Sequence, residues 1–269
     1  MDPKKELRGS EDPRQNDSDG PQDCGLSEEG QARVTDLAQR CADLCGRADR
    51  LCREGAHEQA ADTYGQAVVV AQETGDALTV GDCLVRQGLA FMAAGKDADA
   101  VEPLKRGVAV LEEHSGARAP GLRFAWDMLT TAHLRCRDLD EAQSAAARLL
   151  AVARANNGET FPLFTDALRR LAFVVACRGD FDEAQALIAQ ATEIVGESCG
   201  QDEEPYAALL GEAATLHIAS GAAAAEPLLT RMHGILDRLG LADHPDHQAP
   251  MKCFEWVRGL LESGVRESA

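Results

Sequence analysis

The sequence has few aromatic and few basic residues. Phe, Trp and Tyr make up 4% of its 269 residues, and 27 Lys and Arg face 45 Asp and Glu, which gives a formal net charge of −18. Surfaces for nucleic acids or anionic membranes need clustered Lys and Arg, so this balance argues against both as partners. The sequence contains no run of about 18 apolar residues, so no membrane-spanning helix is expected.

Motifs for catalysis and for cofactor binding are also lacking. The sequence has no glycine-rich dinucleotide loop after a strand, no Gly-Lys-Ser/Thr phosphate loop and no Gly-x-Ser-x-Gly elbow. Carboxylate pairs such as Glu112-Glu113 fall at expected helix ends, where a solvated surface explains them. We therefore expect no enzymatic activity, no catalytic residues and no cofactor.

Cysteine occurs nine times, an odd number, and is scattered along expected helices rather than arranged as a disulfide framework. The N-terminus leads into no apolar segment of the kind found in signal peptides. Reduced thiols in a cytoplasmic protein are the simplest interpretation.

Alanine is abundant while β-branched and aromatic residues are sparse, a composition typical of close-packed helices. Residues 1–26 differ, because they are rich in Asp, Glu, Gly, Pro, Ser and Gln and have hardly any apolar side chains. Such a segment cannot bury enough surface to offset its ordering entropy, so we expect a disordered acidic N-terminal tail. Ser27, followed by two acidic residues, is expected to cap the first helix.

An internal repeat organises the rest of the chain. Four similar segments end in Ala60, Ala100, Ala142 and Ala184, which are 40, 42 and 42 residues apart. A second marker has the same period: Gly75, Gly116, Gly158, Gly200 and Gly240 are spaced by 41, 42, 42 and 40 residues. A proline follows each of the last four of these glycines within five residues, as is common after helix ends. Because two independent markers have the same period, a true sequence repeat explains them better than chance.

Each period therefore contains two helices. We expect tight turns between them at Gly55, Gly95, Arg137, Gly179 and Gly221, and longer turns after the glycines of the second marker. The fold predicted for residues 27–245 is all-α: a right-handed α-solenoid of about five helix-turn-helix repeats, in which each unit buries its apolar faces against the next. Residues 246–269 have helical apolar spacing and are expected to form a C-terminal capping helix.

The segment Gly179-Asp180-Phe181-Asp182-Glu183-Ala184, with Leu168, Leu171, Ala172 and Val175 before it, resembles a tetratricopeptide repeat (TPR). The period of 40–42 residues is longer than the common 34 and resembles the long-helix variety of kinesin light chains and many bacterial proteins. This resemblance implies an interaction module, an adaptor or scaffold that binds a peptide or partner domain in a concave groove. An alternative is a ligand-responsive regulator that senses a signalling peptide and acts on a separate effector.

The resemblance also implies which residues line the groove, on the first helix of each repeat. Carried over position by position, the partner-binding residues are Arg86, Leu89, Met92, Phe124, Asp127, Thr131, Arg169, Arg170 and Phe173. The three arginines could bind acidic side chains bidentately, which would favour a protein or peptide partner with acidic or mixed-charge segments. Alternatively, they pair with Asp82, Asp127 and Asp166 from neighbouring repeats.

Three cysteines of the first expected helix, Cys41, Cys45 and Cys52, lie within about 40° of one another around its axis. Such a stripe could hold a metal ion, but structural zinc needs four ligands, commonly with shorter spacing. Buried cysteine also packs as a small apolar residue, so we expect packing and no metal. The segment His244-Pro245-Asp246-His247 is likewise interpreted as a loop rather than a metal site.

Overall fold

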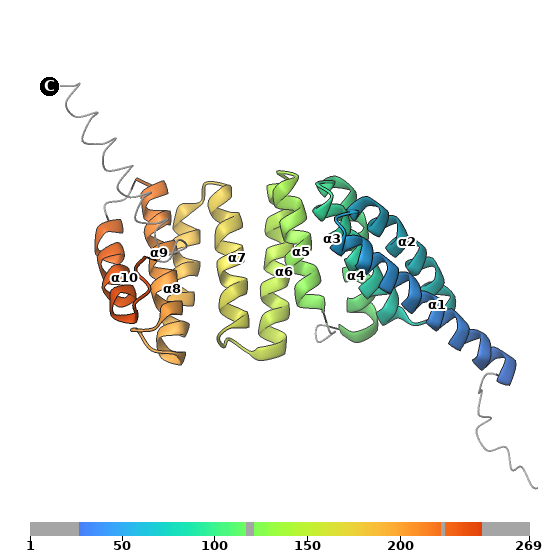
Figure 1. Cartoon of the computed structure of the whole chain (residues 1–269). Coiled ribbons are helices and arrows are strands. Elements are labelled where there is room, and N and C mark those ends of the chain that lie inside the picture. Colours follow the sequence, from blue (N-terminus) through green and yellow to red (C-terminus); the bar gives the residue numbers. More distant parts are fainter. Residues whose placement is uncertain (1–26, 117–120, 222–223, 244–269) are drawn as a thin grey trace, which may run out of the picture.

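The computed structural model describes residues 27–116, 121–221 and 224–243, and every regular element within these residues is an α-helix (Figure 1). The helices are α1 (Glu28–Arg53), α2 (His57–Thr74), α3 (Ala77–Ala93), α4 (Asp97–Ser115), α5 (Leu122–Arg135), α6 (Leu139–Asn157), α7 (Leu163–Cys177), α8 (Phe181–Ser198), α9 (Glu204–Ala219) and α10 (Ala225–Leu239). The expected N-terminal tail, the expected capping helix and the segment His244–His247 lie outside the described residues.

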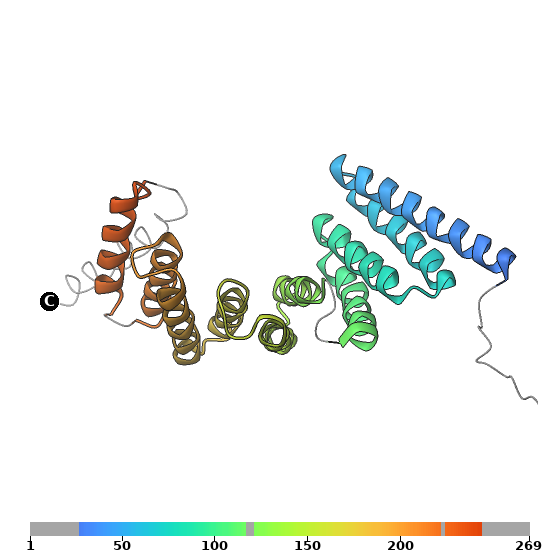
Figure 2. The ribbon, with the colours of Figure 1, turned by 90° about the horizontal axis from the view of Figure 1, so that it is seen from below.

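The helices follow one another in chain order along a row, and each packs against the one before and the one after it (Figure 1). Seen from below, the row is an arc whose two ends, α1 and α10, rise on the same side (Figure 2). The prediction of an all-α solenoid built from helix-turn-helix repeats is confirmed. No helix in the described part of the chain has the length and apolarity that a bilayer crossing would need.

The helix ends lie where the sequence markers predict them. Both sets of glycine markers have positive φ, for example 80° at Gly55 and 74° at Gly75, the left-handed conformation that ends a helix most easily at glycine. Arg137 occupies the corresponding turn of the third repeat with φ 61°, and it is the one non-glycine residue with positive φ among those described. At the start of α1, the Ser27 side chain accepts a hydrogen bond from the Gly30 amide, as expected for an N-cap.

Small residues let neighbouring helices approach closely. Ala60, Ala100, Ala142 and Ala184, the repeat markers, are all completely buried. On α3, a Cβ atom added to Gly88 would lie 2.5 Å from Cγ of Leu104 on α4, so only glycine fits there without displacement. The apolar core continues from repeat to repeat, because its buried clusters combine residues of adjacent helix pairs. The odd-numbered helices of neighbouring repeats come close enough for ion pairs between α1 and α3, α5 and α7, and α7 and α9.

Candidate functional site

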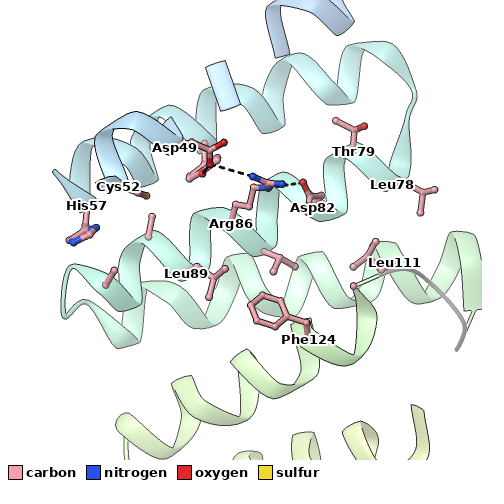
Figure 3. Close-up of a pocket in the computed structure, with 15 residues that line it drawn as sticks. Asp49, Cys52, His57, Leu78, Thr79, Asp82, Arg86, Leu89, Leu111 and Phe124 are labelled. Carbon is pink, nitrogen blue, oxygen red and sulfur yellow. Dashed lines mark hydrogen bonds and ion pairs between the residues drawn. The ribbon is translucent and has the colours of Figure 1, made fainter. Parts of the chain in front are cut away.

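A pocket of about 730 Å³ lies at the N-terminal end of the solenoid, among α1, α2, α3, α4 and the start of α5 (Figure 3). α3 supplies most of its lining. Val85, Leu89 and Leu111 give it an apolar wall, and Phe124 closes one side from α5. Phe124 and Leu78, which both line the pocket, are 43% and 44% exposed. The pocket therefore presents apolar surface at its rim as well as inside.

A charged network borders the pocket on the side of α1. Arg86 donates a hydrogen bond from Nε to Oδ2 of Asp82 at 2.7 Å and from Nη1 to Oδ1 of Asp49 at 3.3 Å (Figure 3). The Tyr64 hydroxyl donates to the same Asp49 oxygen. Burial, together with this hydrogen bond to a carboxylate, raises the pKa of Tyr64, so its hydroxyl stays protonated and donating. Among the Asp, Glu, Lys and Arg residues of the lining, Asp49 and Asp82 carry negative charges and Arg86 carries one positive charge.

The structure brings three of the expected groove residues, Arg86, Leu89 and Phe124, into this pocket. Met92 is only 7% exposed and packs in the core between the second and third repeats, so we leave it out of the candidate surface. The remaining expected groove residues lie on α5 and α7, outside the pocket lining: Asp127, Thr131, Arg169, Arg170 and Phe173. Among these five residues, Phe173 is the one with a large apolar side chain, and it is 57% exposed.

Sequence reasoning missed the contributions of the second helices and of the start of α3. His57 and Tyr64 of α2, Leu111 of α4 and Leu78 of α3 all line the pocket. Tyr64 could have been identified from the sequence, because it occupies an aromatic position of the repeat pattern. The others reach the pocket through the way the helices pack, which the pattern of a single helix does not encode.

The groove arginines are paired with carboxylates of the chain itself. Arg170 donates from Nε to Oδ1 of Asp127 at 2.7 Å, and Arg169 donates from Nε to Glu212 at 3.0 Å. The alternative interpretation of paired arginines is therefore confirmed, because the expected carboxylates Asp82, Asp127 and Asp166 each pair with one of the three arginines. Of these three expected pairs, only that of Arg170 with Asp127 joins neighbouring repeats. Asp82 and Asp166 sit on the same helices as their arginines, and the cross-repeat partners of Arg86 and Arg169 are Asp49 and Glu212.

A second group of chemically notable side chains lies between α1 and α3. The Sγ atom of Cys83 on α3 is 3.5 Å from Sγ of Cys45 and 4.0 Å from Sγ of Cys41, both on α1. Cys52, the third cysteine of the expected stripe, is not part of this group and lines the pocket instead. The hydrogen bond from Cys83 lowers the pKa of the Cys45 thiol to about 7, whereas burial raises the pKa of Cys41.

No protein-family model and no curated protein sequence matches the chain. Among solved structures, it is similar to a kinesin light chain-like protein of Podospora anserina with nearly identical TPR-like repeats, with 20% identity, a TM-score of 0.65, and coverage of 75% of this chain and 96% of the other. It is also similar to BtubC from P. vanneervenii, with 16% identity, a TM-score of 0.63, and coverage of 80% and 93% respectively. The chain thus has the TPR-like repeat fold that its sequence resemblance implied.

Proposed function

We propose that the protein is a non-catalytic interaction module, an adaptor or scaffold, that binds a peptide segment of a partner protein in the pocket among α1, α3 and α5. The observation that carries this proposal is the pocket itself. Its volume of about 730 Å³ falls in the usual range for ligand sites, and two large apolar side chains, Leu78 and Phe124, stand exposed at its rim. A cytoplasmic location stays a prediction from the sequence.

The charges around the pocket narrow the chemistry of the segment. Arg86 is held between Asp49 and Asp82, so much of its capacity to bind a partner's carboxylate is already used. The excess charge of the lining is negative, as is the formal charge of the whole chain, −18. Complementarity therefore favours a mixed-charge segment that places a bulky apolar side chain against Leu89 and Phe124 and a Lys or Arg near Asp49 and Asp82.

Selection from a random peptide library tests this proposal on the purified full-length chain. Peptides that bind should share a bulky apolar residue with a basic residue close to it in sequence. The double substitution Leu89→Asp and Phe124→Asp should weaken their binding by about tenfold or more, because it places charges in the apolar wall. The control is Val69→Asp, which changes an apolar residue on α2 that is 57% exposed and does not line the pocket.

Two results would contradict the proposal. The first is a selected peptide that binds the pocket double variant as tightly as the unmodified chain, because its site would then lie elsewhere. The second is a consensus dominated by acidic residues, since the pocket lining offers those residues a net repulsion. Circular dichroism of each variant checks that the helical fold is retained.

A further inference from the structure

The thiols of Cys41, Cys45 and Cys83 face one another where α1 crosses α3. All three Sγ atoms lie within 4.8 Å of one another, and Sγ of Cys83 is 3.5 Å from that of Cys45 and 4.0 Å from that of Cys41. A metal–sulfur bond of about 2.3 Å places the three sulfurs of a trigonal plane about 4 Å apart. The sulfur atoms therefore already have nearly the separation that one ion at their centre would require.

The surroundings favour a soft ion with three sulfur ligands over a four-coordinate one. Within the described ranges, no His, Asp or Glu side chain joins the three thiols as a fourth ligand, which structural zinc would need. Thiolate ligands select soft ions such as copper(I). Leu37, Val80 and Leu84 pack in the same buried cluster as Cys41 and Cys83 and keep water from that side. A dry, sulfur-rich environment of this kind stabilises the cuprous state.

Of the three cysteines, Cys45 is the one through which an ion from solvent can reach the cluster. Cys41 and Cys83 are 3% and 1% exposed, whereas Cys45 is half-buried and forms the outer edge. An ion that arrives at Cys45 has the two inner sulfurs close by, because Sγ of Cys83 is 3.5 Å from Sγ of Cys45 and all three sulfurs lie within 4.8 Å of one another. Cys41 and Cys83 are 42 residues apart in sequence, and the cluster joins the first helices of two successive repeats.

We propose that Cys41, Cys45 and Cys83 form a trigonal binding site for one copper(I) ion. The ion enters and remains as copper(I), so no electron is transferred. Each thiol that becomes a thiolate ligand releases its proton to solvent, and three copper–sulfur bonds form. The site is separate from the proposed peptide pocket, since none of the three cysteines lines it.

The test is a titration of the reduced full-length chain with copper(I) under anaerobic conditions, in competition with a chromophoric copper(I) chelator. The unmodified chain should retain one copper ion per chain against the chelator, and X-ray absorption should give three sulfur ligands. Cys83→Ala and Cys45→Ala should each lower the affinity by at least about 100-fold. The matched control Cys52→Ala removes a cysteine of the same helix and should leave the affinity unchanged.

Cys45→Ala keeps the test decisive if the buried Cys83→Ala substitution prevents folding, because Cys45 is only half-buried. Equal copper retention by Cys45→Ala and by the unmodified chain would overturn the proposal. So would copper with two sulfur ligands, or an equal loss of affinity in Cys52→Ala. Retention of zinc(II) but not copper(I) in a parallel titration would also overturn it, and would indicate a four-coordinate site with a water ligand. Failure of peptide binding has no bearing on any of these outcomes.

Discussion

Arg170 on α7 and Asp127 on α5 are 43 residues apart in sequence, yet Nε of Arg170 donates a hydrogen bond to Oδ1 of Asp127 at 2.7 Å. The same relationship recurs along the solenoid. Arg169 reaches Glu212 of α9, 43 residues away, and Arg86 reaches Asp49 of α1, 37 residues away. In each case an arginine joins neighbouring odd-numbered helices across roughly one repeat period. Charges that could be taken for free partner-binding groups therefore link one repeat to the next.

A double-mutant cycle on Arg170 and Asp127 measures the strength of such a link. The pair is partly shielded, with side chains 34% and 21% exposed, so we expect a coupling of about 0.5–1 kcal/mol that weakens at high salt. The control pair, Arg238 and Asp202, is 60% and 82% exposed and should show a coupling close to zero. Urea unfolding of the single and double alanine variants gives both values. Equal couplings would refute the structural role of the first pair.

Arg137→Gly should stabilise the protein. Arg137 has φ 61°, a conformation that strains any residue with a Cβ atom, and the corresponding turns of the other repeats have glycine. We expect the free energy of unfolding to rise by roughly 1 kcal/mol, the cost of a left-handed conformation for a residue with a Cβ atom. Cys136→Gly is the control, because Cys136 is the neighbouring exposed residue with φ −74°, where glycine only adds freedom to the unfolded chain. A lower melting temperature for Arg137→Gly would contradict this prediction. It would show that the Arg137 side chain stabilises the fold by more than the backbone strain destabilises it.

Gly88→Ala should destabilise the contact between α3 and α4. The new methyl group would lie 2.5 Å from Cγ of Leu104, which is completely buried and has little room to move. Overpacking of this kind costs roughly 1–3 kcal/mol, more than the helix propensity that alanine adds. Gly46→Ala on α1 is the matched control: its Cβ would meet nothing within 4 Å, so we expect a gain of about 0.5–1 kcal/mol. Thermal unfolding of both variants should show shifts of opposite sign.

His133 should make stability depend on pH below neutrality. Its side chain is 3% exposed, and burial, with a smaller effect of Lys105, lowers its pKa below the ordinary 6.5 despite the nearby Asp138. At a pH between the pKa of His133 in the folded chain and its pKa in the unfolded chain, the unfolded chain binds more protons. The contribution of His133 to the free energy of unfolding is therefore complete above the unfolded-state pKa and decreases as the pH drops below that value.

Unfolding measured from about pH 7.5 to about pH 5.5 checks this effect. His133→Gln should lose less stability on acidification than the unmodified chain. His114→Gln, which changes an exposed histidine, should follow the unmodified chain. If His133→Gln and the unmodified chain had the same pH dependence, the buried histidine would not be its source.

The architecture could be predicted from the sequence because its determinants are local and repeated. Glycines at the helix ends, replaced by Arg137 in one turn, and alanines at the starts of second helices recur with one period, and each acts within a few residues of its own position. Met92 shows the limit of this reasoning. It was expected in the groove from its place in the repeat, but its side chain is buried in the apolar cluster that the second and third repeats share, which depends on how the two repeats pack.

The two candidate sites were harder to predict for the same reason. The thiol cluster combines Cys45 with Cys83, 38 residues away, whereas analysis of one helix face grouped Cys45 with Cys52. The pocket depends on Tyr64 and Leu111, which reach it from the second helices of two repeats. Such contacts follow from helix crossing, which periodicity alone does not specify.

The most direct test of the proposed function is a paired pull-down from native lysate, read by mass spectrometry. The baits are the full-length chain, the pocket variant with Leu89→Asp and Phe124→Asp, and the control Val69→Asp. The account predicts a partner that is retained by the unmodified chain and by Val69→Asp and is lost from the folded pocket variant. A partner retained equally by all three baits would contradict it, because the binding surface would then lie outside the pocket.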